Sequence, residues 1–285
     1  MGHYPLFLLH QAQQPNIVRS ENNTSTNLLL LTRREMQEMK SMNTAVALVA
    51  TIAFAGSATA ATNSYGTFVG DNVTYTDVKE SSTKPLPLFG APTIAGDALD
   101  FNPINFDASA PSIDLTDSQL QFMLSANDAG VGLTTLTIEE EGDYTVIGGP
   151  GATAYASVAT PVHIAILGVN GVDVSGPVLV DELVFATGNE FVLPAAGGVL
   201  SGVFAGTITI DFLDMLVGSP FEGGQVTKAL VSFDNTLVAF SDSTSSAFIK
   251  KKDSDGVVII TETDVPEPAS AALLALGLLG LARRS

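Results

Sequence analysis

Runs of alternating apolar and polar residues, separated by glycine-rich turns, dominate the chain between residues 61 and 264. Residues 207–212 read Thr-Ile-Thr-Ile-Asp-Phe, so Ile208, Ile210 and Phe212 share one side of an extended chain, because successive side chains of a strand point to opposite faces. The same alternation predicts strands at residues 119–125, 133–139, 162–167, 179–186, 203–212, 226–231, 236–240 and 257–261.

Turn sequences lie between these runs: Gly-Gly-Pro-Gly at 148–151, Asn-Gly at 170–171 and Asp-Ser-Asp-Gly at 253–256, all typical turn formers. Many short strands with one apolar face predict an all-β fold, an antiparallel β-sandwich of jelly-roll or immunoglobulin-like type. We expect residues 248–252 and 257–261 to form a β-hairpin across the last of these turns.

Residues 86–108 contain three prolines and follow another at Pro85, and proline is confined to the edges of sheets. This segment is therefore expected to form an edge strand with long loops. Within residues 61–264 the best candidate for a short helix is 211–217. We expect residues 61–264 to form one domain, although a division into two near residues 148–151 stays open.

The apolar run at residues 45–56 follows Lys40 and closes on the small residues Ala58, Thr59 and Ala60. A positive start, an apolar middle and an A-x-A site are the parts of a secretory signal peptide, which predicts a signal helix cut after Ala60 or, as second choice, after Ala61. Such a peptide begins near the N-terminus, so we interpret residues 1–60 as a mis-called start plus signal peptide, with the true start near Met39. An extended signal n-region is the alternative.

The last 21 residues, 265–285, have three parts: Pro266-Glu267-Pro268, an apolar stretch at 269–282, and the pair Arg283 and Arg284. This order resembles the sorting tail of the bacterial PEP-CTERM proteins. The resemblance implies processing by an exosortase-type enzyme and a transient anchor in the inner membrane.

The physical properties of the tail agree with this interpretation. Arginines prefer the cytoplasmic side of a membrane, and the prolines keep the junction extended. Fourteen residues rise only about 21 Å as a helix, against a hydrocarbon core of about 30 Å, so a buried or interfacial helix is the alternative. Because the stretch is apolar all round and a double arginine follows it, we expect a C-terminal transmembrane sorting helix.

The body at residues 61–264 is strongly acidic. It holds all but four of the chain's 30 acidic residues, with six lysines and no arginine, which gives a net charge of about −20. A surface of this charge repels nucleic acid and anionic membrane surfaces. We therefore expect no nucleic-acid partner.

Residue types that build common catalytic centres are scarce. The chain has no cysteine, and His163 is the one histidine after the predicted signal peptide. A catalytic triad with histidine needs serine and acid partners in a recognisable motif, and a histidine- or cysteine-based zinc site needs several ligands. The G-x-S-x-G motif does not occur in the sequence. We interpret His163 as a structural strand residue and expect no enzymatic activity and no cofactor.

Calcium is the metal that oxygen ligands favour. Asp253 and Asp255 resemble the opening of a calcium loop, but Gly256 stands where a fifth-position acid or amide is required. Residues 139–143, Glu-Glu-Glu-Gly-Asp, form a denser acidic cluster. Each segment predicts at most weak calcium binding, and a solvated turn or strand end is the alternative for both.

Two classes of function remain. The first is an exported envelope or extracellular-matrix protein associated with exopolysaccharide. The second is a non-catalytic carbohydrate-binding module on the cell surface, although a sandwich fold does not by itself fix function. A row of exposed Tyr or Phe on one sheet face would favour sugar binding, whereas a plain acidic face would favour the matrix protein.

Overall fold

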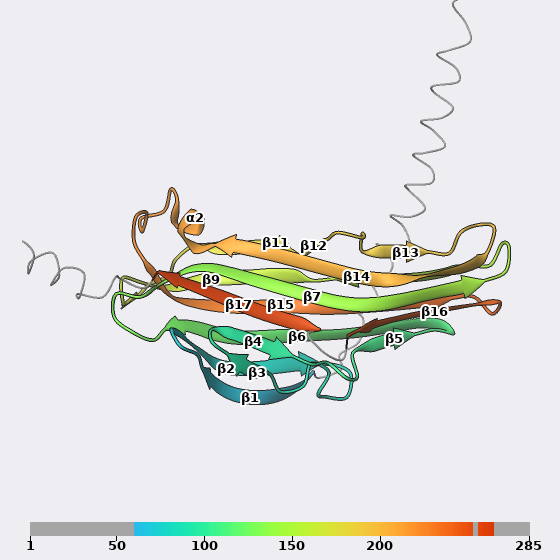
Figure 1. Cartoon of the computed structure of the whole chain (residues 1–285), viewed down its shortest axis with the longest axis horizontal. Helices are drawn as coiled ribbons and strands as arrows, with labels where there is room; N and C mark the ends of the chain where they lie inside the picture. The colour runs from blue at the N-terminus through green and yellow to red at the C-terminus, as the bar shows by residue number, and fades with distance from the viewer. Residues whose placement is uncertain (1–59, 253–255, 265–285) are drawn as a thin grey trace, which may run out of the picture. The chain divides into compact units, whose positions relative to one another are not determined.

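The computed structural model describes residues 60–252 and 256–264. These residues form two antiparallel sheets that pack on a shared apolar core (Figure 1). The predicted class, an all-β sandwich of antiparallel sheets, is confirmed at this level. Within the described ranges no helix is long and apolar enough to cross a membrane. The predicted signal helix and sorting helix lie outside those ranges.

The first sheet is built around one long central strand, β15 (Val226–Ser241). On one side of β15 lie β6 (Ser112–Ala126), β2 (Val73–Ser82) and β1 (Ala61–Val69), in that order. On its other side β15 pairs with two strands that follow each other end to end, β8 (Ala154–Ala159) and β9 (Pro161–Val169). The short edge strands lie beyond these two: β13 (Glu190–Val192) pairs with β8, and β10 (Val172–Asp173) and β11 (Val178–Glu182) pair with β9.

The second sheet is centred on β7 (Gly132–Gly148). On one side it pairs with β14 (Gly198–Asp211), which pairs in turn with the two-residue strand β12 (Val184–Phe185). On its other side β7 pairs with β16 (Ser245–Lys251) and β17 (Val257–Asp264). Beyond β17 lie β4 (Ala98–Phe101) and then β3 (Thr93–Ala95), and beyond β16 lies β5 (Asp107–Ser109).

The prediction of a hairpin between residues 248–252 and 257–261 is wrong. Both β16 and β17 pair antiparallel with β7, β16 with residues 142–148 and β17 with residues 132–140. The amide of Lys252 donates to the carbonyl of Glu141 (3.0 Å), and the amide of Glu141 donates to the carbonyl of Gly256 (3.1 Å). β16 and β17 therefore run in the same direction along β7, one after the other.

Two other expectations from the sequence also differ from the structure. Residues 226–231 and 236–240 belong to one strand, β15, because inward and outward positions keep alternating through Phe233 and Asn235. The cluster at 148–151 is neither a hairpin loop nor a linker between domains, since it carries the chain from β7 in one sheet to β8 in the other.

The predicted short helix is confirmed as α2 (Phe212–Leu216), and Asp211 caps it by accepting from the amides of Leu213 and Asp214, the usual role of an N-cap acid. The proline-rich segment forms β3, β4 and β5 with loops between them, as expected for a sheet edge.

Aromatic side chains fill the space between the two sheets. The ring of Phe89 meets the rings of Phe101, Phe106 and Phe233 edge to face, with centroids 5.0–6.2 Å apart. This is the favoured arrangement for buried aromatic pairs. The rings come from the proline-rich segment and from both sheets, so the core fastens that segment to the sandwich.

Candidate functional site

The last described strand, β17, ends at Asp264, directly before the predicted sorting tail. The last residue of β17, Asp264, pairs with Gly132 at the start of β7. The sorting residues Pro266, Glu267, Pro268, Arg283 and Arg284 lie outside the described residues. At the other end, Ala60 is exposed and directly precedes β1, which starts at Ala61, while Ala58 lies outside the described residues.

The acidic run at residues 139–143 lies inside β7 and is neither a turn nor a strand end. Because successive side chains of a strand point to opposite faces, Glu140 points into the core while Glu139, Glu141 and Asp143 point outward. Lys252 forms an ion pair with Glu141. Among the described residues no group of three His, Asp or Glu side chains could hold a metal ion. Asp253 and Asp255 lie outside the described residues.

His163 lies on the outer face of β9, where it is exposed and stands opposite Val180 and Ser232. Its neighbours Val162 and Ile164 are buried. His163 therefore lies in a strand, as interpreted from the sequence.

A cluster of four polar side chains crosses the core between the two sheets: Glu140, Thr160, Asn235 and Lys251, all with no exposed surface. The Lys251 ammonium lies 3.0 Å from Glu140 Oε2. The hydroxyl of Thr160 is 2.9 Å from the same Oε2 and 3.1 Å from Asn235 Oδ1. A continuous chain of polar contacts therefore runs from Lys251 on β16 to Asn235 on β15.

This cluster, which we call the intersheet cluster, is incompletely satisfied. Neither Glu140 Oε1 nor Asn235 Nδ2 has a hydrogen-bond partner within the described structure, although buried polar atoms normally find one. Burial lowers the pKa of the Lys251 ammonium, and the nearby Glu140 carboxylate opposes that shift. The ring of Phe106 lies 5.4 Å from Lys251 Nζ. Burial thus makes the charged form of Lys251 less favourable than it would be in water.

A second buried carboxylate, Glu80, is fully satisfied. Its Oε1 accepts from the amides of Leu88 (2.9 Å) and Phe89 (3.1 Å) and from the hydroxyl of Ser118 (3.0 Å). Its Oε2 accepts a hydrogen bond from the hydroxyl of Tyr65. Glu80 therefore fastens the proline-rich segment to β2.

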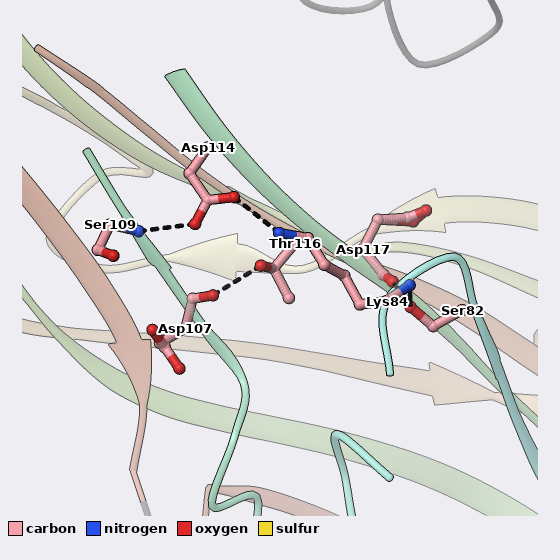
Figure 2. A network of polar contacts seen from close by, with 7 residues as sticks. All are labelled: Ser82, Lys84, Asp107, Ser109, Asp114, Thr116 and Asp117. Carbon is pink, nitrogen blue, oxygen red and sulfur yellow. Dashed lines mark hydrogen bonds and ion pairs between the residues drawn. The ribbon is translucent and has the colours of Figure 1, made fainter. Parts of the chain in front are cut away.

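A polar network beside β6 holds the same segment from outside (Figure 2). Asp114 accepts from the ammonium of Lys84 (2.7 Å) and from the amide of Ser109 (3.0 Å). The hydroxyl of Thr116 donates to the carbonyl of Asp107 (2.6 Å). Together Lys84 and Ser109 lower the pKa of Asp114 despite its partial burial. We interpret the network as a structural clasp between β6, β5 and the loop after β2.

Aromatic side chains on the surface do not form a row. Of the described Tyr and Phe residues, only Phe240 is classed as exposed, at 37%, and it pairs across the sheet with the half-buried Tyr155. A depression of about 460 Å³ lies at the β6–β7 and β9–β10 turns. Its lining is small and polar, and Lys228 and Asp173 form an ion pair there (2.7 Å).

The sequence analysis did not predict the intersheet cluster, although a signal for it exists. Lys251 continues the inward series Ala247 and Ile249, Glu140 follows Ile138, and Asn235 follows Phe233, each two positions along a strand. A polar residue at a position that the alternation assigns to the apolar, inward face of a strand indicates a buried polar group.

These features define an antiparallel two-sheet protein whose last described strand ends at Asp264. Residues 264–285 match the family model of the PEP-CTERM protein-sorting motif. The resemblance inferred for the tail is thereby confirmed, and the chain is an exported protein sorted through this motif.

A search of curated proteins gives no match to the chain. Among solved structures, it is similar to that of the infectious bursal disease virus Gt strain at 13% identity, with a TM-score of 0.09, 76% of this chain covered and 61% of that chain. T=1 particles derived from the same virus give 12% identity and a TM-score of 0.11, with 76% and 58% covered. The chain thus spans less than two thirds of these viral chains, and TM-scores this low carry no argument.

Proposed function

We propose that the chain is a non-catalytic protein of the cell envelope or extracellular matrix, processed at its PEP motif by an exosortase-type enzyme and associated with exopolysaccharide. The observation that carries the proposal is the position of the sorting motif. The motif starts at residue 264, which is also the last residue of β17. Cutting the tail would leave every described strand intact.

The composition of the body supports a matrix role. About 20 net negative charges keep such a protein soluble and repel other polyanions at low salt. Divalent cations would be needed to bridge it to an acidic polysaccharide.

We further infer that the two sheets form a jelly-roll or immunoglobulin-like sandwich, since the chain crosses between sheets at several connections.

The alternative, a carbohydrate-binding module, has weaker support. Flat aromatic side chains commonly bind sugar rings, but among the described Tyr and Phe residues only Phe240 is exposed, and it pairs with the half-buried Tyr155. The depression beside Asp173 and Lys228 is lined by no aromatic side chain within the described residues.

Replacing Pro266, Glu267 and Pro268 with alanine in the full chain tests the sorting step. In a host with an exosortase, we expect the variant to stay in the membrane fraction as precursor while the wild type is released. Glu262→Ala is the matched control, because it removes the same charge from an exposed residue just before the motif. Equal release of the triple variant and the control would contradict the proposal.

Cosedimentation with purified exopolysaccharide separates the two candidate functions. A matrix protein of this charge should bind in a calcium-dependent manner that salt weakens. A carbohydrate-binding module should bind a defined oligosaccharide saturably, and Tyr155→Ala with Phe240→Ala should abolish that binding.

A further inference from the structure

The intersheet cluster brings together an amine, a carboxyl group and a carboxamide in a space without exposed surface. Lys251, Glu140 and Asn235 each have zero exposed surface. Glu140 Oε2 is the common neighbour: it lies 3.0 Å from Lys251 Nζ and 2.9 Å from Thr160 Oγ1, which in turn lies 3.1 Å from Asn235 Oδ1. An ion pair alone does not explain why a carboxamide is buried at the end of this chain.

The protons of the cluster favour a neutral amine beside a protonated carboxyl group. Thr160 has one hydroxyl hydrogen but faces two acceptor oxygens, Glu140 Oε2 and Asn235 Oδ1. If Lys251 passes a proton to Glu140, the carboxyl group donates to Thr160 and the hydroxyl donates to Asn235. Two opposite charges are then removed from a site where burial penalises both.

We propose that Lys251 and Asn235 join through an intramolecular amide bond between Lys251 Nζ and Asn235 Cγ, with Glu140 as the proton carrier. The neutral amine attacks Cγ while the hydroxyl of Thr160 polarises the carbonyl oxygen. The Nζ–Cγ bond forms and the Cγ–Nδ2 bond breaks. The protonated Glu140 carboxyl group delivers its proton to Nδ2, which leaves as ammonia, and the carboxylate so formed takes the proton that Nζ loses on forming the amide. No oxidant or other reactant is needed.

The surroundings favour this reaction over hydrolysis. The cluster is closed by the core, and Phe106 lies over the amine, 5.4 Å from Nζ to the ring centroid. Asn235 Nδ2, the leaving group, has no hydrogen-bond partner among the described residues, so no contact of that kind holds it in place. Fixed reactants in a dry site gain a large effective concentration.

The bond would add a covalent link across the core between two strands that the chain already joins at one end, through the short connection at residues 242–244. Asn235 is on β15 in the first sheet and Lys251 is the last residue of β16 in the second. The chain has no cysteine, so a disulfide cannot supply a covalent tie between the sheets. An amide differs from a disulfide in resisting reduction.

Mass spectrometry of the secreted protein, with both of its ends mapped, tests the proposal. We expect an intact mass lower than that of the sequence by one ammonia, and a branched proteolytic peptide that joins Asn235 to Lys251. A full mass would overturn the proposal. A mass lower by one water, with a branch between Lys251 and Glu140, would also overturn it, because the carboxyl group would then be the acyl donor.

Three variants test which residue carries the proton and which supplies the acyl group. Glu140→Gln keeps the size of the side chain but not its proton, so we expect the full mass together with a native circular dichroism spectrum. Glu80→Gln is the matched control, since it changes an equally buried carboxylate and should still lose ammonia. Asn235→Asp should lose one water in place of ammonia. Loss of ammonia from Glu140→Gln would rule out Glu140 as the proton carrier.

Discussion

Glu80 and Glu140 are the same residue type, both lie on inward positions of strands, and both have no exposed surface. Their surroundings differ. Glu80 accepts hydrogen bonds from two backbone amides and two hydroxyls, whereas Glu140 has one oxygen with two close partners and one with none among the described residues.

The difference separates a structural carboxylate from a reactive one. Donors on both oxygens hold Glu80 in one position and stabilise it as an anchor for the proline-rich segment. Glu140 instead shares its contacts with an amine that burial pushes toward neutrality. Burial alone therefore does not indicate a reactive carboxylate, whereas burial together with missing hydrogen-bond partners does.

The largest expected effect comes from removing the anchor. Glu80→Ala leaves the amides of Leu88 and Phe89 and the hydroxyls of Ser118 and Tyr65 without their acceptor, and buried donors left unpaired cost about 1–3 kcal/mol each. We expect the free energy of unfolding in urea to fall by about 3–5 kcal/mol. Glu80→Gln keeps one acceptor oxygen and should lose less than half as much. A loss below about 0.5 kcal/mol for Glu80→Ala would remove the distinction between the two carboxylates.

A smaller effect appears at alkaline pH. Burial and the neighbouring Glu80 raise the pKa of Tyr65 above its ordinary value of 10.0. A group whose pKa is higher in the folded chain stabilises the fold fully below the unfolded pKa and loses that contribution as the pH rises above it. Stability should therefore fall above pH 10, and Tyr65→Phe should make that fall less steep.

Tyr75→Phe serves as the comparison for Tyr65→Phe. Burial raises the pKa of Tyr75 as well, but its hydroxyl bonds to the carbonyl of Asp97 and to Thr261, away from Glu80. Each single variant should flatten part of the alkaline decline measured by urea unfolding, and the double variant most of it. An unchanged decline in the double variant would mean that other groups control it.

The smallest expected effect concerns calcium at Asp253 and Asp255. Glu141, the residue opposite this loop, is already paired with Lys252, so a bound ion would have few further carboxylates. Calcium at a concentration equal to its Kd adds about 0.4 kcal/mol, which raises Tm by roughly 1–2 °C for a domain of this size. Sodium at equal ionic strength is the control, and Asp253→Asn with Asp255→Asn should abolish the difference. Equal responses to both salts would leave screening as the explanation.

Alternation is a local property, and it located β6, β7, β9, β14, β15 and β17 from the sequence. It did not predict β1, β2 or β8, and the single run expected at 179–186 divides into β11 and β12, which belong to different sheets. It misjudged the segment from Phe248 to Val257, since a turn-forming sequence does not tell whether the next strand pairs with the previous one or continues beside the same neighbour, as β17 does after β16. The hydrogen bonds of Glu141, more than 100 residues away, decide between these outcomes. The intersheet cluster was missed for a related reason. Its members are polar residues of four separate segments, and only the packing of two sheets brings them together.

The position of β17 has a mechanical consequence. The strand that leads into the tail is not an edge strand, since it pairs with β7 along its length and with β4 on its other side. Because hydrogen bonds in antiparallel sheets run perpendicular to the strands, a pull on the tail along β17 loads these bonds together in shear, and does not peel them apart singly. A body tethered through this strand is built to withstand traction from the membrane until the tether is cut.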